Sequence, residues 1–154
     1  MSFLILHNIR SAENVGSLFR TADAFGVTRI FLTGYTPAPL DRFKRPVGRI
    51  AKTALGAEKT VPWEQAEVAD VIARLQSDGV CVVALEQDVR SQSVASYIPV
   101  SPWALVLGNE VLGIDPHTLA LTDVVLEIPM AGQKESLNVA VAAGVALYAL
   151  TANN

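Results

Sequence analysis

The sequence predicts one three-layer α/β domain, residues 1–154, with a mostly parallel sheet. Short apolar runs alternate with longer segments whose apolar residues recur every three or four positions, patterns typical of buried strands and amphipathic helices. Residues 80–85 and 104–107 are apolar throughout, as expected for parallel strands covered on both faces. The 154 residues, 51% of them hydrophobic, fit a single domain with a sizeable core.

The first part of the chain is expected to contain strands at residues 3–7 and 27–33. Between them, apolar residues at i, i+3, i+4, i+7 and i+10 from Val15 form a helical stripe that ends at Gly26. Residues 34–56 are rich in glycine, proline and basic side chains, and we expect one short helix there.

The remaining elements are expected to be a helix, two strands, a short helix, a strand and a final helix, at residues 64–78, 80–85, 104–107, 115–121, 124–128 and 137–151. The final helix is apolar on almost every side. A helix without a polar face has to be covered all round, so it packs inside the domain or against a second subunit.

Several classes of protein are excluded by residues that the sequence lacks. Cys81 is the only cysteine, which excludes a disulfide framework or a cysteine-based zinc site within one chain. His7 and His117 have no second ligand at metal-binding spacing, so we expect no metal. Phosphate-binding glycine loops, GxSxG and HExxH are absent. No apolar run reaches the ~18–20 residues of a membrane span and no secretory signal is visible, so we expect a cytoplasmic protein.

The charge of the chain is unevenly distributed. The total is −3, yet residues 1–59 hold nine bases and four acids, a net +5. Residues 42–52 contain five bases and no acid: Arg42, Lys44, Arg45, Arg49 and Lys52. Phosphates are contacted by local Lys and Arg side chains whatever the total charge. This segment is therefore a candidate surface for a polyanion, although an ordinary solvated loop explains it equally well.

A first polar segment lies on the first helix. Arg20 is opposite the apolar stripe, with Gly16 one turn before it and Ala24 one turn after. Glycine costs a helix about 1 kcal/mol relative to alanine, so Gly16 indicates a close approach to the backbone. Small residues beside a guanidinium would leave a shallow slot suited to a sugar-phosphate. The alternative is an ordinary surface arginine.

Two further polar segments follow later strands. After the strand at 104–107, Gly108 allows a turn that places Asn109 and Glu110 where ligands bind in α/β sheets; a simple polar turn is the alternative. In residues 128–138, Ser136 can cap the last helix, and Asn138 lies just inside it, where a buried amide needs partners. A structural and a functional role for Asn138 are equally open.

Together these segments resemble a known family. Asn-x-Gly-x3-Arg at Asn14, Gly16 and Arg20 comes first. Leu-Gly-Asn-Glu-x2-Gly follows at residues 107–113, and Ile-Pro-Met-x-Gly-x3-Ser-Leu-Asn-Val at residues 128–139. The three are similar to the motifs of SpoU/TrmH-type RNA ribose 2′-O-methyltransferases of the SPOUT superfamily, over residues 8–150. One difference is Ala140, where the family usually has serine.

The resemblance implies an α/β fold with a deep C-terminal trefoil knot that binds S-adenosyl-L-methionine, and a homodimer formed through the last helix. It places the cofactor on Leu85, Gly108, Ile128, Met130 and Leu137, and the catalytic or loop-ordering roles on Asn14, Arg20, Glu110, Ser136 and Asn138. RNA would contact Arg10, Arg42, Lys44, Arg45, Arg49 and Lys52, because no separate RNA-binding domain is expected.

The implied reaction is methylation of a ribose 2′-hydroxyl in tRNA or rRNA. A guanidinium stays protonated at neutral pH and is a poor general base, so we expect Arg20 to position a phosphate and stabilise developing alkoxide charge. Two alternatives are open. One is a catalytically silent RNA-binding knot protein, and the other is an α/β enzyme that uses the same pocket for a small molecule.

Overall fold

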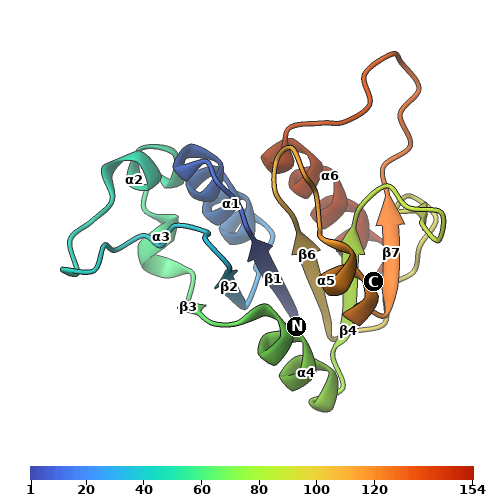
Figure 1. Ribbon diagram of the computed structural model, residues 1–154, viewed down its shortest axis with the longest axis horizontal. Coiled ribbons are helices and arrows are strands. Elements are labelled where there is room, and N and C mark those ends of the chain that lie inside the picture. The colour runs from blue at the N-terminus through green and yellow to red at the C-terminus, as the bar shows by residue number, and fades with distance from the viewer.

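The computed structural model describes residues 1–154 as a three-layer α/β fold with one parallel sheet (Figure 1). Its seven strands are β1 (Ser2–His7), β2 (Arg29–Thr33), β3 (Trp63–Gln65), β4 (Cys81–Leu85), β5 (Gln92–Ser93), β6 (Trp103–Leu107) and β7 (Val124–Glu127). They lie in the order β3-β2-β1-β6-β4-β7-β5, and every neighbouring pair is parallel. The predicted three-layer α/β class with a parallel sheet is confirmed.

Six helices cover the two faces of the sheet: α1 (Ala12–Ala24), α2 (Gly48–Ala54), α3 (Ala57–Thr60), α4 (Val68–Ser77), α5 (Pro116–Leu121) and α6 (Val139–Ala152). Alternate residues of each strand point to opposite layers. Leu4 of β1 pairs in register with Leu105 of β6, and both belong to the core cluster that includes α1 and α6. The next pair, Ile5 and Val106, belongs to the cluster that includes α4 and α5. The sheet is therefore buried on both faces.

The expected helix at residues 64–78 starts too early. Residues 63–65 form β3, which extends the sheet edge by pairing with β2, and α4 begins only at Val68. β5, at Gln92–Ser93, was also missed. Strands of two or three residues are too short to show an alternating pattern, and a neighbouring strand rather than their own sequence determines them.

The close approach at Gly16 is to another helix and not to a ligand. Gly16 is buried, and a Cβ atom built on it would overlap the side-chain oxygen of Thr53 and the carbonyl oxygen of Ile50, both in α2. The Thr53 hydroxyl also donates a 2.8 Å hydrogen bond to the carbonyl of Glu13. The predicted slot beside Arg20 is therefore wrong at its Gly16 end, because α2 fills that space.

Helix α6 is the most apolar helix. It buries Ala143, Ala146, Leu147 and Leu150 against the domain, but Val141, Val145 and Tyr148 are exposed along one side. Neither this helix nor any other is long and apolar enough to cross a membrane.

We expect Gly16→Ala to lower the free energy of unfolding by about 1–3 kcal/mol, since overpacking at the α1–α2 contact outweighs the higher helix propensity of alanine. Urea unfolding measures the change. Gly48→Ala is the matched control, because Gly48 is also helical and a Cβ there meets nothing within 4 Å. Equal stability of the two variants would contradict the α1–α2 packing.

Candidate active site

A cavity of about 510 Å³ opens at the carboxyl ends of β4, β6 and β7. Parallel strands bring their carboxyl ends to the same edge of a sheet, which is the usual ligand-binding edge of α/β folds. All five residues expected to bind the cofactor line this cavity: Leu85, Gly108, Ile128, Met130 and Leu137. They come from three segments of the chain that lie far apart in the sequence.

The loop after β6 forms one wall of the cavity. Asn109 and Gly113 exchange two backbone hydrogen bonds, of 3.1 and 3.0 Å, and the Asn109 side-chain oxygen accepts from the N–H groups of Val111 and Leu112 at 2.9 Å. A Cβ on Gly108 would lie 2.5 Å from the carbonyl carbon of Gly113. Only glycine fits there without moving the loop, as the motif implied.

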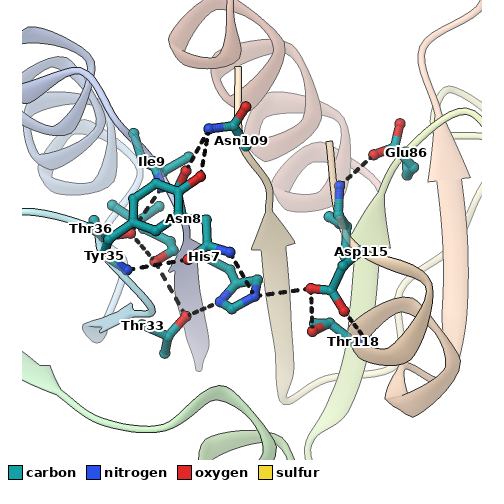
Figure 2. Close-up of polar contacts among 12 residues, drawn as sticks. His7, Asn8, Ile9, Thr33, Tyr35, Thr36, Glu86, Asn109, Asp115 and Thr118 are labelled. Atoms are coloured by element: carbon teal, nitrogen blue, oxygen red, sulfur yellow. Dashed lines mark hydrogen bonds and ion pairs between the residues drawn. The ribbon is translucent and has the colours of Figure 1, made fainter. Parts of the chain in front are cut away.

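Glu86 holds the far end of the same loop, a role that sequence reasoning missed. Its Oε2 accepts a 2.8 Å hydrogen bond from the N–H of Ile114 (Figure 2), and its Oε1 accepts one of 3.0 Å from the N–H of Gln87. Gly113 has a φ of +69°, and a Cβ on it would overlap the Glu86 carboxylate. The sequence did offer a sign of this role. Glu86 is the first residue after a buried strand, a position similar to that of Asn109, which is the second residue after the next buried strand.

Glu110 connects this loop to the start of α1. Its carboxylate accepts hydrogen bonds from the N–H groups of Arg10 and Ser11, both at 3.0 Å, and from the Asn14 side-chain amide at 3.2 Å. Burial alone would raise the pKa of Glu110, but these donors and its own backbone N–H outweigh burial and keep its pKa below the usual value. The carboxylate is therefore held ionised.

Asn138 joins the third motif to the other two. Its amide group donates to the side-chain oxygen of Asn14 at 3.2 Å, and its own oxygen accepts from the N–H groups of Ala140 and Val141. Asn138 is the exposed N-cap of α6, so the expectation of a buried amide inside the helix is wrong, and Ser136 does not cap the helix. Ser136 instead lines the cavity.

Four of the five predicted catalytic residues thus meet at this edge. Glu110, Asn14 and Asn138 form a continuous hydrogen-bonded chain beside the cavity that Ser136 lines. Asn14 is 96 positions from Glu110 and 124 positions from Asn138 in the sequence. Arg20 is different. It is exposed on α1, forms no hydrogen bond or ion pair, and does not line the cavity within one chain.

A polar cluster missed by sequence reasoning joins the carboxyl ends of β1 and β2 to the start of α5 (Figure 2). His7 is only 7% exposed, and its ring nitrogens contact the Thr33 hydroxyl at 2.9 Å and the Asp115 carboxylate at 3.1 Å. Asp115 also caps α5 by accepting from the N–H of Thr118. Burial opposes ionisation of Asp115, but the Thr118 and His7 donors keep its pKa below the usual value. The cluster fixes the ends of β1, β2 and α5 together.

The Asn109 amide and the Tyr35 hydroxyl continue this cluster to the surface. Asn109 donates from its amide to the backbone oxygen of Asn8 and to the Tyr35 hydroxyl, both at 3.0 Å. Tyr35 is 56% exposed, so its hydroxyl bonds from the surface to Asn109, a residue that lines the cavity (Figure 2). No group of three or more His, Cys, Asp or Glu side chains is placed to hold a metal ion.

Five of the six predicted RNA-binding bases lie at the other side of the molecule, on and before α2. Arg45 pairs with Asp41 at 3.0 Å and Arg49 pairs with Glu13 at 2.8 Å, whereas Arg42, Lys44 and Lys52 have no ion-pair partner. Arg10 is exposed at the start of α1, and its side chain is also unpaired. The bases remain candidates for RNA contact, with two of them partly neutralised.

Comparison with protein families gives one match, and it covers nearly the whole chain. Residues 1–148 match the SpoU rRNA Methylase family. Among curated proteins, the 23S rRNA (guanosine(2553)-2′-O)-methyltransferase RlmP of Bacillus subtilis is 35% identical over 149 residues, which are 96% of this chain and 56% of that protein. The chain thus spans little more than half the length of this relative.

Solved structures with the same fold point to the same chemistry. The AdoMet-bound rRNA methyltransferase from Sinorhizobium meliloti superposes with a TM-score of 0.85 at 30% identity, covering 96% of this chain and 54% of that one. A structure described by the 2-OH methylation of C/U34 on tRNA has a TM-score of 0.79 at 28% identity, covering 96% of this chain and 92% of that one. The second neighbour is therefore nearly equal in length.

The lowered pKa of Glu110 predicts a pH-dependent contribution to stability. A carboxylate whose folded pKa is depressed stabilises the fold above its unfolded pKa of about 4.5, and this contribution is lost as the pH falls through the lower folded pKa. We expect Glu110→Gln to cost about 1–3 kcal/mol at pH 7, because a backbone N–H loses its acceptor. The deficit should shrink below pH 4.5 in urea unfolding. Glu67→Gln is the control, since the Glu67 side chain makes no hydrogen bond; a deficit independent of pH would contradict the assignment.

The Arg49 guanidinium, which donates two hydrogen bonds to the Glu13 carboxylate, lowers the pKa of Glu13 to about 2. We expect Arg49→Gln to raise this pKa toward the ordinary 4.5. A carbon-detected NMR titration at low salt measures it directly. Arg45→Gln removes an equal charge nearby and should leave the Glu13 titration in place. An unchanged Glu13 pKa in Arg49→Gln would show that the ion pair does not form in solution.

Proposed function

This chain belongs to the SpoU rRNA methylase family, and from that membership we propose that it transfers a methyl group from S-adenosyl-L-methionine to a ribose 2′-hydroxyl of RNA. The observation that carries the proposal is the hydrogen-bonded chain of Glu110, Asn14 and Asn138 beside the cavity. It joins one side chain from each of the three motifs. A structural accident would not bring together all three at the ligand-binding edge of the sheet.

The proposed substrate is rRNA, with tRNA as the alternative. The B. subtilis relative is named for 23S rRNA, whereas the structural neighbour of nearly equal length is described by methylation of tRNA. Either RNA would be modified in the cytoplasm. In both cases the unpaired bases of this chain would contact phosphates, which fix position but carry no base sequence.

The cavity fits the cofactor. Its volume of about 510 Å³ is within the roughly 300–1,000 Å³ of small-molecule sites, and its lining combines the apolar Leu85, Ile128 and Leu137 with backbone groups at strand ends. When bound there, S-adenosylmethionine supplies an electrophilic methyl group on a sulfonium. Glu86 and Glu110 hold the loop that forms one wall, so the site is shaped before any ligand arrives.

The chain's own residues have separate tasks in this proposal. Alignment of two reactants can lower a barrier by several kcal/mol, and Asn14, Glu110 and Asn138 keep the surrounding loops in place for it. Arg20, free of any partner in the chain, holds the phosphate next to the target ribose and stabilises the developing alkoxide charge. The hydroxyl proton leaves to phosphate or water. Ser136 lines the cavity, and in this proposal it faces the RNA.

We further propose a homodimer and a knotted C-terminus. Val141, Val145 and Tyr148 follow one another at i, i+4 and i+7 on the exposed side of α6, an apolar stripe that a second copy of the same helix would cover. The trefoil knot would involve the segment from β7 through α6. Residues 1–154 would then act as one methyltransferase domain.

Transfer of labelled methyl to separated rRNA and tRNA pools from cells lacking the gene tests the activity. We expect alkali-resistant label at one position in one pool, and a loss of about a hundredfold or more in Arg20→Ala, since removal of one such charge-stabilising donor costs 10²–10³. Arg29→Ala is the control, because Arg29 starts β2 at the opposite end of the sheet and pairs with Glu64. Arg20→Lys separates charge from guanidinium shape.

The outcomes distinguish the alternatives. Cofactor and RNA binding without transfer to any RNA would favour a silent RNA-binding protein. Methyl transfer to a small molecule, with no RNA labelled, would favour an α/β enzyme that uses the same pocket for a small molecule. Full activity in Arg20→Ala would remove Arg20 from the mechanism.

A further inference from the structure

An exposed aromatic ring lies at the tip of the loop before α2. Residues 41–45 form this tip, which an antiparallel bridge between Leu40 and Pro46 closes at its base. Phe43 is 62% exposed and belongs to neither core cluster. The guanidinium carbons of Arg42 and Arg45 lie 4.7 and 4.9 Å from its ring centroid. The ring therefore packs against neither core cluster, and the guanidinium groups of two arginines lie over it.

The tip is held in shape by Asp41 and not by burial. One carboxylate oxygen accepts from the N–H groups of Phe43 and Arg45, at 2.8 and 3.0 Å, and the other accepts from the Arg45 side chain at 3.0 Å. Two backbone hydrogen bonds of 2.9 Å, from Asp41 to Arg45 and from Lys44 to Asp41, complete the turn. The backbone that presents the exposed ring is thus held in shape before anything binds, which lowers the entropic cost of binding.

The tip also keeps free positive charge. Arg45 neutralises Asp41, whereas Arg42 and Lys44 have no ion-pair partner. An aromatic ring flanked by free cations suits nucleic acid, because the cations contact phosphates and the ring stacks on a base. Bases within an RNA duplex are already stacked on one another, and the major groove of the duplex is too narrow for side chains to enter. Only an unpaired base can use the ring.

We propose that the tip at residues 41–45 binds an unpaired nucleotide of the RNA substrate, with its base stacked on Phe43 and its phosphates contacted by Arg42 and Lys44. The inference rests on the proposed function and adds the kind of RNA that is recognised. The tip projects beyond the β3 edge of the sheet, whereas the cavity lies at β4, β6 and β7 (Figure 1). Within one chain, the nucleotide at Phe43 is therefore a different one from the nucleotide in the cavity.

Binding of two defined RNAs tests this inference. Fluorescence anisotropy gives the Kd of a 12-nucleotide oligouridine and of a 12-base-pair RNA duplex for the full chain. We expect Phe43→Leu to bind the single strand about tenfold more weakly and the duplex unchanged, since base stacking on an aromatic ring is worth this much. Phe43→Trp should restore binding. Ile98→Ala is the control, because Ile98 is another exposed apolar residue, 74% exposed, away from the tip.

Salt dependence separates stacking from charge. Phe43→Leu should leave the slope of log Kd against log salt unchanged because no charge is removed, whereas Lys44→Gln should flatten it by about one phosphate contact. Lys44 has a positive φ of 60°. Lysine and glutamine both have to adopt it at this position, so Lys44→Gln changes the charge without adding a new kind of backbone strain.

Three results would overturn the inference: wild-type affinity of Phe43→Leu for the single strand, an equal loss for strand and duplex, or binding to phosphatidylserine vesicles that depends on Phe43 while oligouridine binding does not. Phe43-dependent binding of the single strand, in a protein that methylates no RNA, would support the tip and refute the proposed function. The two proposals can therefore fail separately.

Discussion

The Glu110 carboxylate holds together the parts of the molecule that make the site. The first N–H groups of a helix have no partner within the helix, and here a side chain from about a hundred residues later accepts from two N–H groups at the start of α1. It also accepts a hydrogen bond from the Asn14 side-chain amide. The Asn14 side-chain oxygen in turn accepts one from the amide of Asn138, at the start of α6. This one acceptor thus links the cavity wall to the start of α1 and, through Asn14, to the start of α6.

Much of the fold could be predicted from the sequence because it depends on local pattern. The apolar runs at residues 80–85 and 104–107 coincide closely with β4 and β6, and the parallel sheet brings their ends together at the cavity. The five expected cofactor contacts line that cavity because the family motifs mark strand ends. That Glu110 is the acceptor for Arg10 and Ser11 could not be predicted, since hydrogen-bond partners so distant leave no periodicity.

The errors also have a physical reason. Gly16 correctly indicated a close backbone approach, but only the tertiary structure shows that α2 makes it. Asn138 was correctly expected to be a partnered amide. The helix begins at Val139, two residues after the expected start, so Asn138 is its exposed cap and not part of its interior. Glu86 and the His7–Asp115 contact were missed because a single charged or histidine residue after a strand resembles any loop residue.

The start of α1 depends on residues that the ribosome adds late. β1 and α1 come first in the chain, yet β1 pairs with β6, and Glu110 accepts from the N–H groups of Arg10 and Ser11 just before α1. Contacts at such large sequence separation require the closure of long loops before they stabilise anything. During synthesis the N–H groups of Arg10 and Ser11 therefore have no Glu110 acceptor until most of the chain has emerged. Translation order thus makes assembly of the site a late event in folding.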